Sequence, residues 1–291
     1  MEIVNIAAYK FVGVADPALW RPLIKAHCEQ IGVMGNILLA PEGINLFVAG
    51  ERGPVDQFLE YMKNDDLFGS RFASIPVKES LSDHQPFRRM VVRIKDEIIT
   101  MKHTLVYPLG ADANHRAPAV EPLTLKKWLD QGHDDNGREI VLLDTRNDYE
   151  VQIGTFDGAV SYGIDKFSEF PQAFRGTAGD ARTEWQDKTV VSFCTGGIRC
   201  EKAALFLQEP EIGLTNVFQL DGGILRYFEE VGDLHFNGEC FVFDRRVALD
   251  AKLNETTREY EVTAPPGRNA DYLRWKAGQL KTETSERPVN L

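Results

Sequence analysis

The stretch VVSFCTGGIRCEKAA, residues 190–204, decides the fold of the chain around it. β-prone residues at 190–193 lead into a cysteine, a loop with two glycines follows, and residues 201–208 are good helix formers. This order predicts a strand, a tight loop and a helix. Strands and helices alternate before and after it, which predicts an α/β unit: a small doubly wound parallel sheet.

Cys194 is the candidate nucleophile of this unit. Glycines let a loop turn its backbone N–H groups inward, and the start of a helix adds positive potential at the same place. Such surroundings lower the pKa of a thiol from ~8.5 to roughly 3.5–7.5. Arg199 adds a fixed positive charge and a hydrogen-bonding fork. The predicted active-site loop follows the cysteine and consists of Thr195, Gly196, Gly197, Ile198 and Arg199. The competing interpretation is a small core residue that ends a buried strand.

The other three cysteines are not predicted to be the nucleophile. Cys200 stands at the predicted helix start, where it is either a resolving thiol or a packed structural residue. Cys28 and Cys240 are predicted to lie in the core. Four scattered cysteines do not form a disulfide framework.

The apolar run at 140–143 predicts a parallel strand buried on both faces. Asp144 and Arg146 follow at its carboxyl end, where ligands gather in α/β folds, and are candidate accessory residues. The simplest pairing for Arg146 is a structural ion pair with Glu150. The segment 156–160 predicts one further short strand, and Thr124 is the expected cap of the helix that opens this unit.

Residues 1–107 predict a different fold. Strands and amphipathic helices alternate in the order β-α-β-β-α-β, which indicates a ferredoxin-like α+β sandwich. Asp16 followed by proline predicts the start of the first helix, with Leu19, Leu23 and Ile24 facing inward. The last strand material comes from Val77 and from residues 90–94.

A basic cluster falls at the end of this first unit. Its candidate RNA-binding residues are Arg88, Arg89, Arg93 and Lys95. Interleaved apolar residues favour contact with an RNA backbone, and a solvated strand face is the alternative. The motif PEGIN at 41–45 predicts a turn with an unusual polar residue entering a strand.

Composition bounds the class of protein. The chain is 43% hydrophobic and 26% charged, as in ordinary globular proteins. The net charge of -11 argues against indiscriminate nucleic-acid binding, although most of it lies after residue 105. No apolar run is long enough to span a membrane, and no signal segment opens the sequence, so we expect a cytoplasmic protein. No motif indicates a metal or an organic cofactor.

The sequence divides into four predicted parts. The sandwich occupies residues 1–107, and a Pro/Gly-rich linker occupies 108–119. The parallel-sheet domain occupies 120–235. A C-terminal extension occupies 236–291, with a helix expected near residues 270–280.

With these residues in view, the chain resembles a known family. LLDTR at 142–146, the cysteine loop and LDGGI at 220–224 resemble a rhodanese domain. Together with LLAPEGIN at 38–45 and GECFVFD at 238–244, they resemble the rhodanese-containing tRNA uridine(34) hydroxylases. No cysteine follows Cys240, so the tail lacks the metal-binding cysteine pairs that many members carry.

The resemblance implies oxygen-dependent 5-hydroxylation of the wobble uridine in the anticodon loop of tRNA. It also implies that Cys194 is the active-site cysteine, able to carry a persulfide delivered by a sulfur donor, and that molecular oxygen is the co-substrate. A rhodanese-type sulfurtransferase is the alternative. A cysteine-dependent phosphatase is a more distant one, because the loops of those enzymes are commonly one residue longer.

Overall fold

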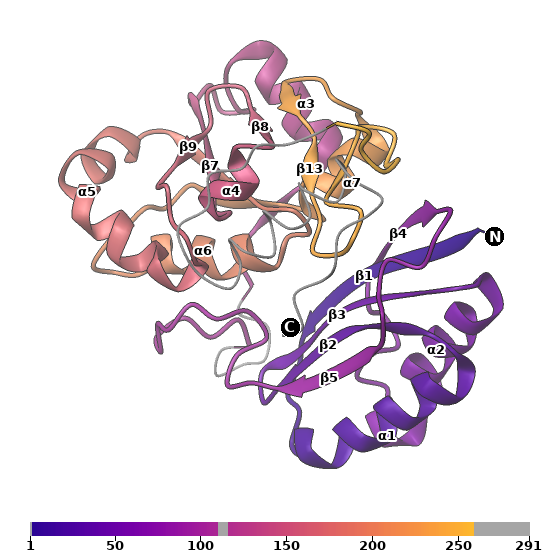
Figure 1. Cartoon of the computed structure of the whole chain (residues 1–291). Coiled ribbons are helices and arrows are strands. Elements are labelled where there is room, and N and C mark those ends of the chain that lie inside the picture. Colours follow the sequence, from indigo (N-terminus) through magenta and orange to yellow (C-terminus); the bar gives the residue numbers. More distant parts are fainter. Residues whose placement is uncertain (1, 110–115, 259–291) are drawn as a thin grey trace.

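The computed structural model describes residues 2–109 and 116–258, which form two sheet-based domains packed against each other (Figure 1). The helix expected near residues 270–280 lies outside the described residues. None of the described helices has the length and apolar character that crossing a bilayer requires.

The first domain is a five-stranded sheet with two helices on one face. Its elements are β1 (Ile3–Phe11), α1 (Pro17–Ile31), β2 (Met34–Ala40), β3 (Gly43–Gly50), α2 (Arg52–Asn64), a 3-10 turn η1 (Asp66–Phe68), β4 (Val77–Ser82) and β5 (Met90–Ile94). The strand order is β4-β1-β3-β2-β5, and only the β2–β5 pair is parallel. The ferredoxin-like sandwich is therefore confirmed, with one addition: the two segments expected to share the last strand form β4 and β5 at opposite edges.

Alternation along the strands gives this sheet two different faces. Ile6, Ile37 and Leu46 belong to the core under α1 and α2. Their strand neighbours on the other face include Asn45 and Phe47, and that face lines a cavity rather than a second layer of helices. Asn45, the polar residue that enters β3 from the PEGIN turn, therefore lines this cavity.

Helix α1 begins where the sequence predicts, because the Asp16 side chain accepts a hydrogen bond from Leu19 N–H at 2.9 Å. The predicted inward face is wrong for Leu19 and Leu23, which are half exposed. The buried stripe contains Trp20, Ile24 and Cys28. Trp20 packs edge-on against Phe68, and this contact places the Trp20 side of the helix, rather than the Leu19 side, against the core.

The second domain is a five-stranded parallel sheet in the order β6-β11-β10-β7-β9. Its elements are β6 (Ala119–Val120), α3 (Pro122–Gln131), β7 (Ile140–Asp144), α4 (Asp148–Val151), β8 (Gly154–Phe156), β9 (Val160–Ser161), η2 (Phe167–Glu169), α5 (Phe170–Trp185), β10 (Thr189–Phe193), α6 (Ile198–Gln208), β11 (Val217–Leu220) and α7 (Gly223–Glu230). Residues of α5 and α6 pack in one core, and residues of α3 and α7 pack in another. Helices thus cover both faces, which confirms the doubly wound sheet.

Two local expectations differ from the structure. Helix α3 begins at Pro122 rather than after a Thr124 cap, because proline fits the first turn of a helix. The single strand expected at 156–160 is two strands, and only β9 joins the main sheet. β8 pairs instead with β12 (Phe236–Gly238) of the C-terminal extension, which continues through β13 (Cys240–Phe241) and β14 (Ala248–Leu249).

Candidate active site

The loop after β10 folds around the sulfur of Cys194. Strand β10 ends at Phe193 and α6 begins at Ile198, with Gly197 in a left-handed conformation (φ 101°) before the helix. A second glycine closes the loop from outside: a Cβ on Gly223 would lie 2.4 Å from the carbonyl oxygen of Cys194. The LDGGI motif therefore supplies the close backbone approach that this loop needs.

Hydrogen-bond donors converge on the Cys194 sulfur. The backbone N–H of Gly197 lies 3.1 Å from Sγ, and Sγ of Cys200 lies 3.6 Å from it. Burial alone disfavours a thiolate, but the Cys200 thiol, the charge of Arg199 and nearby backbone N–H groups outweigh it. Together they hold the pKa of the Cys194 thiol well below its usual range. This is the electrostatic environment that the sequence predicts for a nucleophile.

Cys200 is neither remote nor inert. At the first turn of α6, its sulfur lies 2.9 Å from the Gly197 carbonyl oxygen and 3.6 Å from the Cys194 sulfur, so its single S–H can donate to one or the other. Burial and the neighbouring Cys194 raise the pKa of Cys200 well above its usual value. The two shifts run in opposite directions, which favours ionisation of Cys194 before Cys200. Cys28 and Cys240 are buried as predicted, and burial raises the pKa of each to about 12.

Arg199 reaches the loop from α6 and forms a two-pronged ion pair with Glu150, at 2.6 and 2.8 Å. Glu150 is fully buried at the first turn of α4. Its carboxylate fixes the guanidinium, whose central carbon lies 5.6 Å from the ring centre of Phe243. The predicted orienting role of Arg199 therefore depends on an acid that the sequence analysis had paired elsewhere.

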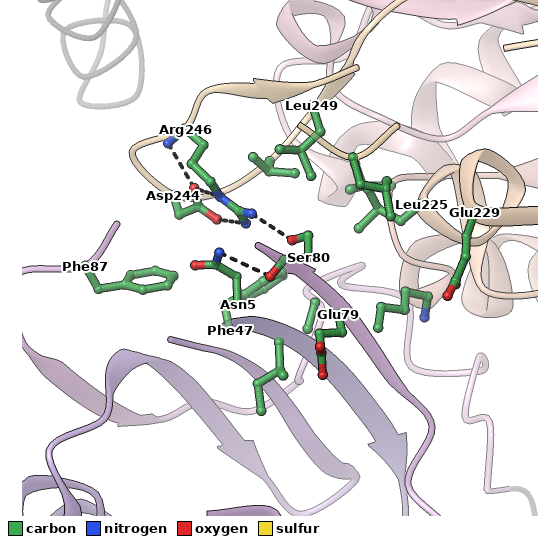
Figure 2. Close-up of a pocket in the computed structure, with 16 residues that line it drawn as sticks. Asn5, Phe47, Glu79, Ser80, Phe87, Leu225, Glu229, Asp244, Arg246 and Leu249 are labelled. Atoms are coloured by element: carbon green, nitrogen blue, oxygen red, sulfur yellow. Dashed lines mark hydrogen bonds and ion pairs between the residues drawn. The ribbon is translucent and has the colours of Figure 1, made fainter. Parts of the chain in front are cut away.

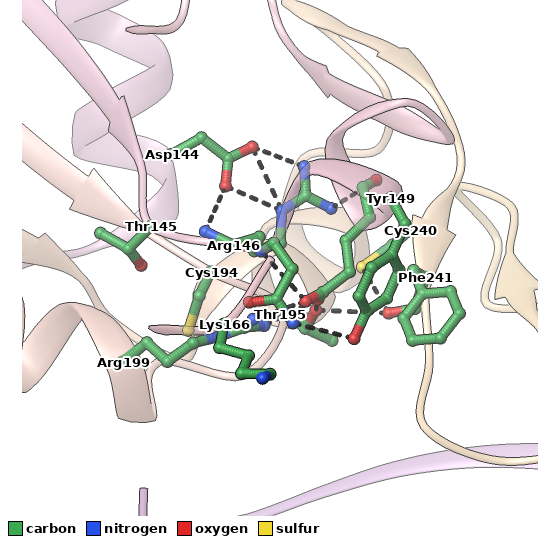
Figure 3. A network of polar contacts seen from close by, with 12 residues as sticks. Asp144, Thr145, Arg146, Tyr149, Lys166, Cys194, Thr195, Arg199, Cys240 and Phe241 are labelled. Carbon is green, nitrogen blue, oxygen red and sulfur yellow. Dashed lines mark hydrogen bonds and ion pairs between the residues drawn. The ribbon is translucent and has the colours of Figure 1, made fainter. Parts of the chain in front are cut away.

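The expected Arg146–Glu150 ion pair is wrong. Arg146 instead pairs with Asp144, with Nη2 at 2.6 Å and Nε at 2.9 Å from the carboxylate, and both side chains are fully buried (Figure 3). Thr155 also donates to Asp144 at 2.7 Å. The residue numbering favoured a one-turn pairing, but Arg146 reaches only the backbone carbonyl of Glu150, at 3.5 Å, because the Glu150 carboxylate binds Arg199. Asp144 and Arg146 brace the carboxyl end of β7 and do not line the cavity beside Cys194.

A buried lysine connects the cysteine helix to the first domain. Lys202, on α6, lies 2.9 Å from a Glu42 carboxylate oxygen and 2.7 Å from one of Glu97, and it donates to the Ile99 carbonyl at 3.2 Å. Glu42 also accepts the N–H of Ile98 at 2.7 Å. The PEGIN turn, for which the sequence favoured a structural role, contains Glu42 and is therefore where the cysteine helix contacts the first domain.

A cavity of about 500 Å³ lies between the open sheet face of the first domain and the cysteine loop. This volume is within the roughly 300–1,000 Å³ typical of ligand pockets. One wall carries aromatic rings, and four lysines contribute to the lining. Its lining includes Asn45, Phe47, Lys78, Lys95, Lys102, Tyr149, Lys166, Phe167, Cys194, Thr195, Gly196, Ile198, Arg199 and Phe243.

Cys194 touches the boundary of this cavity but exposes no surface to solvent. Its loop neighbours Thr195, Ile198 and Arg199 are also buried. A substrate atom therefore reaches the sulfur only when a covering side chain shifts. Figure 3 shows Lys166 and Tyr149 close to the cysteine loop, where they flank this approach.

The basic cluster is divided by the structure. Lys95 lines the cavity, whereas Arg88, Arg89 and Arg93 do not. Arg93 lies on β5, the edge strand of the sheet, and Arg88 and Arg89 precede that strand. Lysines at 78, 102 and 166 complete the basic lining of the cavity. Lys95 and Lys102 belong to one basic stretch of the sequence, but Lys78 and Lys166 come from separate segments, so sequence proximity could not reveal the four as one group.

A second seam between the domains lies beside the C-terminal extension. Arg246 donates to Ser80 Oγ of β4 at 2.7 Å and pairs with Asp244, while Asn5 binds the Ser80 carbonyl at 3.3 Å (Figure 2). The extension thus bridges the two sheets and fixes Phe243, two residues after β13, beside Phe47 of β3, with ring centres 6.1 Å apart.

These features define the class of protein: an acylphosphatase-like domain joined to a rhodanese-like domain with a cysteine in the loop between β10 and α6. A family model described as a UPF0176 acylphosphatase-like domain matches residues 3–98, and a rhodanese-like domain model matches residues 122–230.

Comparison with curated proteins identifies the family. The chain is 58% identical over 257 residues to a tRNA uridine(34) hydroxylase of Burkholderia ambifaria, covering 88% of this chain and 87% of the relative. A protein of the same name from Burkholderia pseudomallei is 57% identical, with 88% and 82% covered. The chain therefore belongs to the tRNA uridine(34) hydroxylase family. Among solved structures, a Saccharomyces cerevisiae homolog of single-domain rhodanese and the Cdc25 phosphatase catalytic domain is 20% identical, covers 42% of this chain and 87% of its own, and has a TM-score of 0.36.

Proposed function

We propose that this protein hydroxylates carbon 5 of uridine 34 in tRNA with molecular oxygen, and that Cys194 is its nucleophile. The observation that carries the proposal is the position of the Cys194 sulfur, 3.1 Å from the backbone nitrogen of Gly197, at the boundary of an interdomain cavity of ligand size. The printed names of the relatives supply the substrate.

The cavity suits a base extruded from an RNA loop. Enzymes that modify a base take it out of the stack and hold it between aromatic or apolar side chains. Phe243 is 41% exposed and lies next to Arg199, so its ring offers a stacking surface beside the cysteine loop. Lysines 95, 102 and 166 provide positive charge for the flanking phosphates, which offsets the acidic character of the chain as a whole.

The thiolate can activate the target carbon directly. Addition of Sγ of Cys194 to C6 of uracil forms a C–S bond and moves the C5=C6 electron pair toward C5 and O4. The electron-rich C5 then reacts with oxygen. The net change places one oxygen atom on C5 and reduces the other to water, which consumes two protons and two electrons from an external reductant such as a thiol. Loss of the C5 proton and of the thiolate restores the C5=C6 bond.

The test is nucleoside analysis of tRNA from cells that lack the protein and express either the wild type or Cys194→Ala. Cys28→Ala is the matched control, because Cys28 is equally buried but belongs to the core of the first domain. We expect 5-hydroxyuridine derivatives with the wild type and the control, and none with Cys194→Ala. Full modification by Cys194→Ala would eliminate the proposed role of the cysteine.

A rhodanese-type sulfurtransferase remains the second candidate, because the same loop can stabilise a persulfide anion on Cys194. In that case tRNA hydroxylation would be intact in cells without the protein. The purified protein would instead form thiocyanate from thiosulfate and cyanide, and Cys194→Ala would abolish this reaction.

A further inference from the structure

The wall of the cavity opposite the cysteine loop contains one buried amide. Asn45 lies on β3 between Tyr9 of β1 and Leu38 of β2, and all three residues line the cavity. Asn45 is 7% exposed, and its neighbours along β3, Ile44 and Leu46, face the apolar core. A buried asparagine has up to four hydrogen-bonding positions to satisfy, so its partners indicate what it does.

The orientation of the Asn45 amide is fixed by its surroundings. Its Nδ2 donates to the carbonyl of Ile98 at 3.2 Å, and a carbonyl can only accept, so the amide oxygen points the other way. Within residues 2–109 and 116–258, no group donates a hydrogen bond to Oδ1, and this oxygen is not closed off among buried atoms. Asn45 therefore presents a hydrogen-bond acceptor to the cavity.

The support for this amide connects it to the cysteine helix. Ile98 donates its N–H to Glu42, and Glu42 is held by Lys202 of α6. The Ile98 side chain also packs in a small cluster with Ile198, the residue before Arg199. The position of Asn45 Oδ1 relative to the cysteine loop is thus set by contacts that cross the domain boundary. Such bracing is what a recognition group needs in order to read a hydrogen-bond pattern.

We propose that Asn45 Oδ1 accepts the N3–H of a uracil held in the cavity, and that Asn45 is the residue that separates uracil from cytosine. The inference rests on the proposed function and names the group that recognises its base. Uracil carries a donor at N3, whereas cytosine carries an acceptor there. An acceptor fixed in the wall pairs with uracil and opposes the cytosine lone pair, and such a mismatch leaves a buried polar group unpaired.

The experiment compares three anticodon stem-loops that differ only at position 34: uridine, N3-methyluridine and cytidine. The full-length wild type should act on uridine with a kcat/KM about 10- to 100-fold above that for N3-methyluridine, which lacks the donor. Asn45→Leu should lower kcat/KM for uridine by about the same factor. It should leave the value for N3-methyluridine unchanged, so the ratio of the two falls to near one, and the preference for uridine over cytidine should fall in the same way.

Asn5→Leu is the matched control, because Asn5 is a similarly buried asparagine on the neighbouring strand β1 that lies outside this cavity. It should keep the ratio of the wild type. A variant that merely folds poorly would lose activity on both substrates together, and its ratio would stay high.

Two outcomes would overturn the inference while the proposed function stands: equal activity of the wild type on uridine and N3-methyluridine, or an Asn45→Leu variant that keeps the discrimination. If the wild type hydroxylates no stem-loop, the proposed function fails instead. The dissociation constants of the same stem-loops, measured by fluorescence anisotropy, then decide the inference. A preference for uridine that Asn45→Leu removes supports it, and the absence of such a preference refutes it.

Discussion

With Cys194 ionised, the single S–H of Cys200 turns from the Gly197 carbonyl to the Cys194 sulfur, and this contact allows a quantitative prediction. Cys200 lies 3.6 Å from Cys194, sulfur to sulfur, and stabilises the thiolate form of Cys194. A hydrogen bond to a charged group contributes about 1.5–3 kcal/mol, and a thiol is a weak donor, which places this one at the lower end. Since one pKa unit corresponds to about 1.36 kcal/mol, Cys200→Ala should raise the pKa of Cys194 by about one unit.

The assay is the rate of Cys194 alkylation by iodoacetamide as a function of pH, with the labelled peptide quantified by mass spectrometry. Because only the thiolate reacts, the inflection of the curve reports the pKa. The curve should move to higher pH in Cys200→Ala and stay close to the wild type in Cys200→Ser, whose hydroxyl is also a donor. Cys28 and Cys240, with pKa values of about 12, should react slowly throughout.

Cys240→Ala is the control for a general loosening of the site, because Cys240 is buried in the second domain without contacting the Cys194 sulfur. The reasoning would be refuted by a Cys200→Ala variant in which the pKa of Cys194 is unchanged. It would be refuted equally if the wild-type inflection fell at the pH of an ordinary thiol.

Two further predictions concern the domain interface and the cavity. Lys202→Met leaves two carboxylates without their buried counterion and should lower the free energy of unfolding by about 3–5 kcal/mol. Lys25→Met, at an exposed pair with Glu29, should cost less than about 1 kcal/mol, and equal urea midpoints for the two variants would contradict the account. Lys95→Ala should weaken stem-loop binding and reduce its log–log salt slope by about one, whereas Lys63→Ala, at the end of α2, should change neither. If the salt dependence of binding were the same in Lys95→Ala as in the wild type, the RNA would not contact Lys95.

Much of the fold could be predicted because its signals are local. The Asp16–Pro17 cap, the apolar run of β7 and the Gly-Gly loop before α6 each specify backbone geometry within a few residues. The errors arise where distant residues decide. Trp20 of α1 packs against Phe68, which lies outside this helix, so the sequence of α1 alone does not reveal the contact.

The candidate site divides in the same way. Cys194 and Arg199 are visible from the sequence because a short loop must hold them. Glu150, Asn45 and Phe243 could not be assigned, because their roles depend on three segments that meet only in the folded protein. The sequence offered one signal: Asn45, the last residue of the PEGIN motif, is a polar residue in a strand whose other residues are mostly apolar.

The ion pair between Glu42 and Lys202 joins positions 160 residues apart. Lys202 also binds Glu97, so a homologous second domain without this lysine would leave two carboxylates without a counterion at the domain interface. We therefore expect the two domains to have been inherited together. A chimera of this chain and a homologue should fold only when it retains both Lys202 and its carboxylate partners.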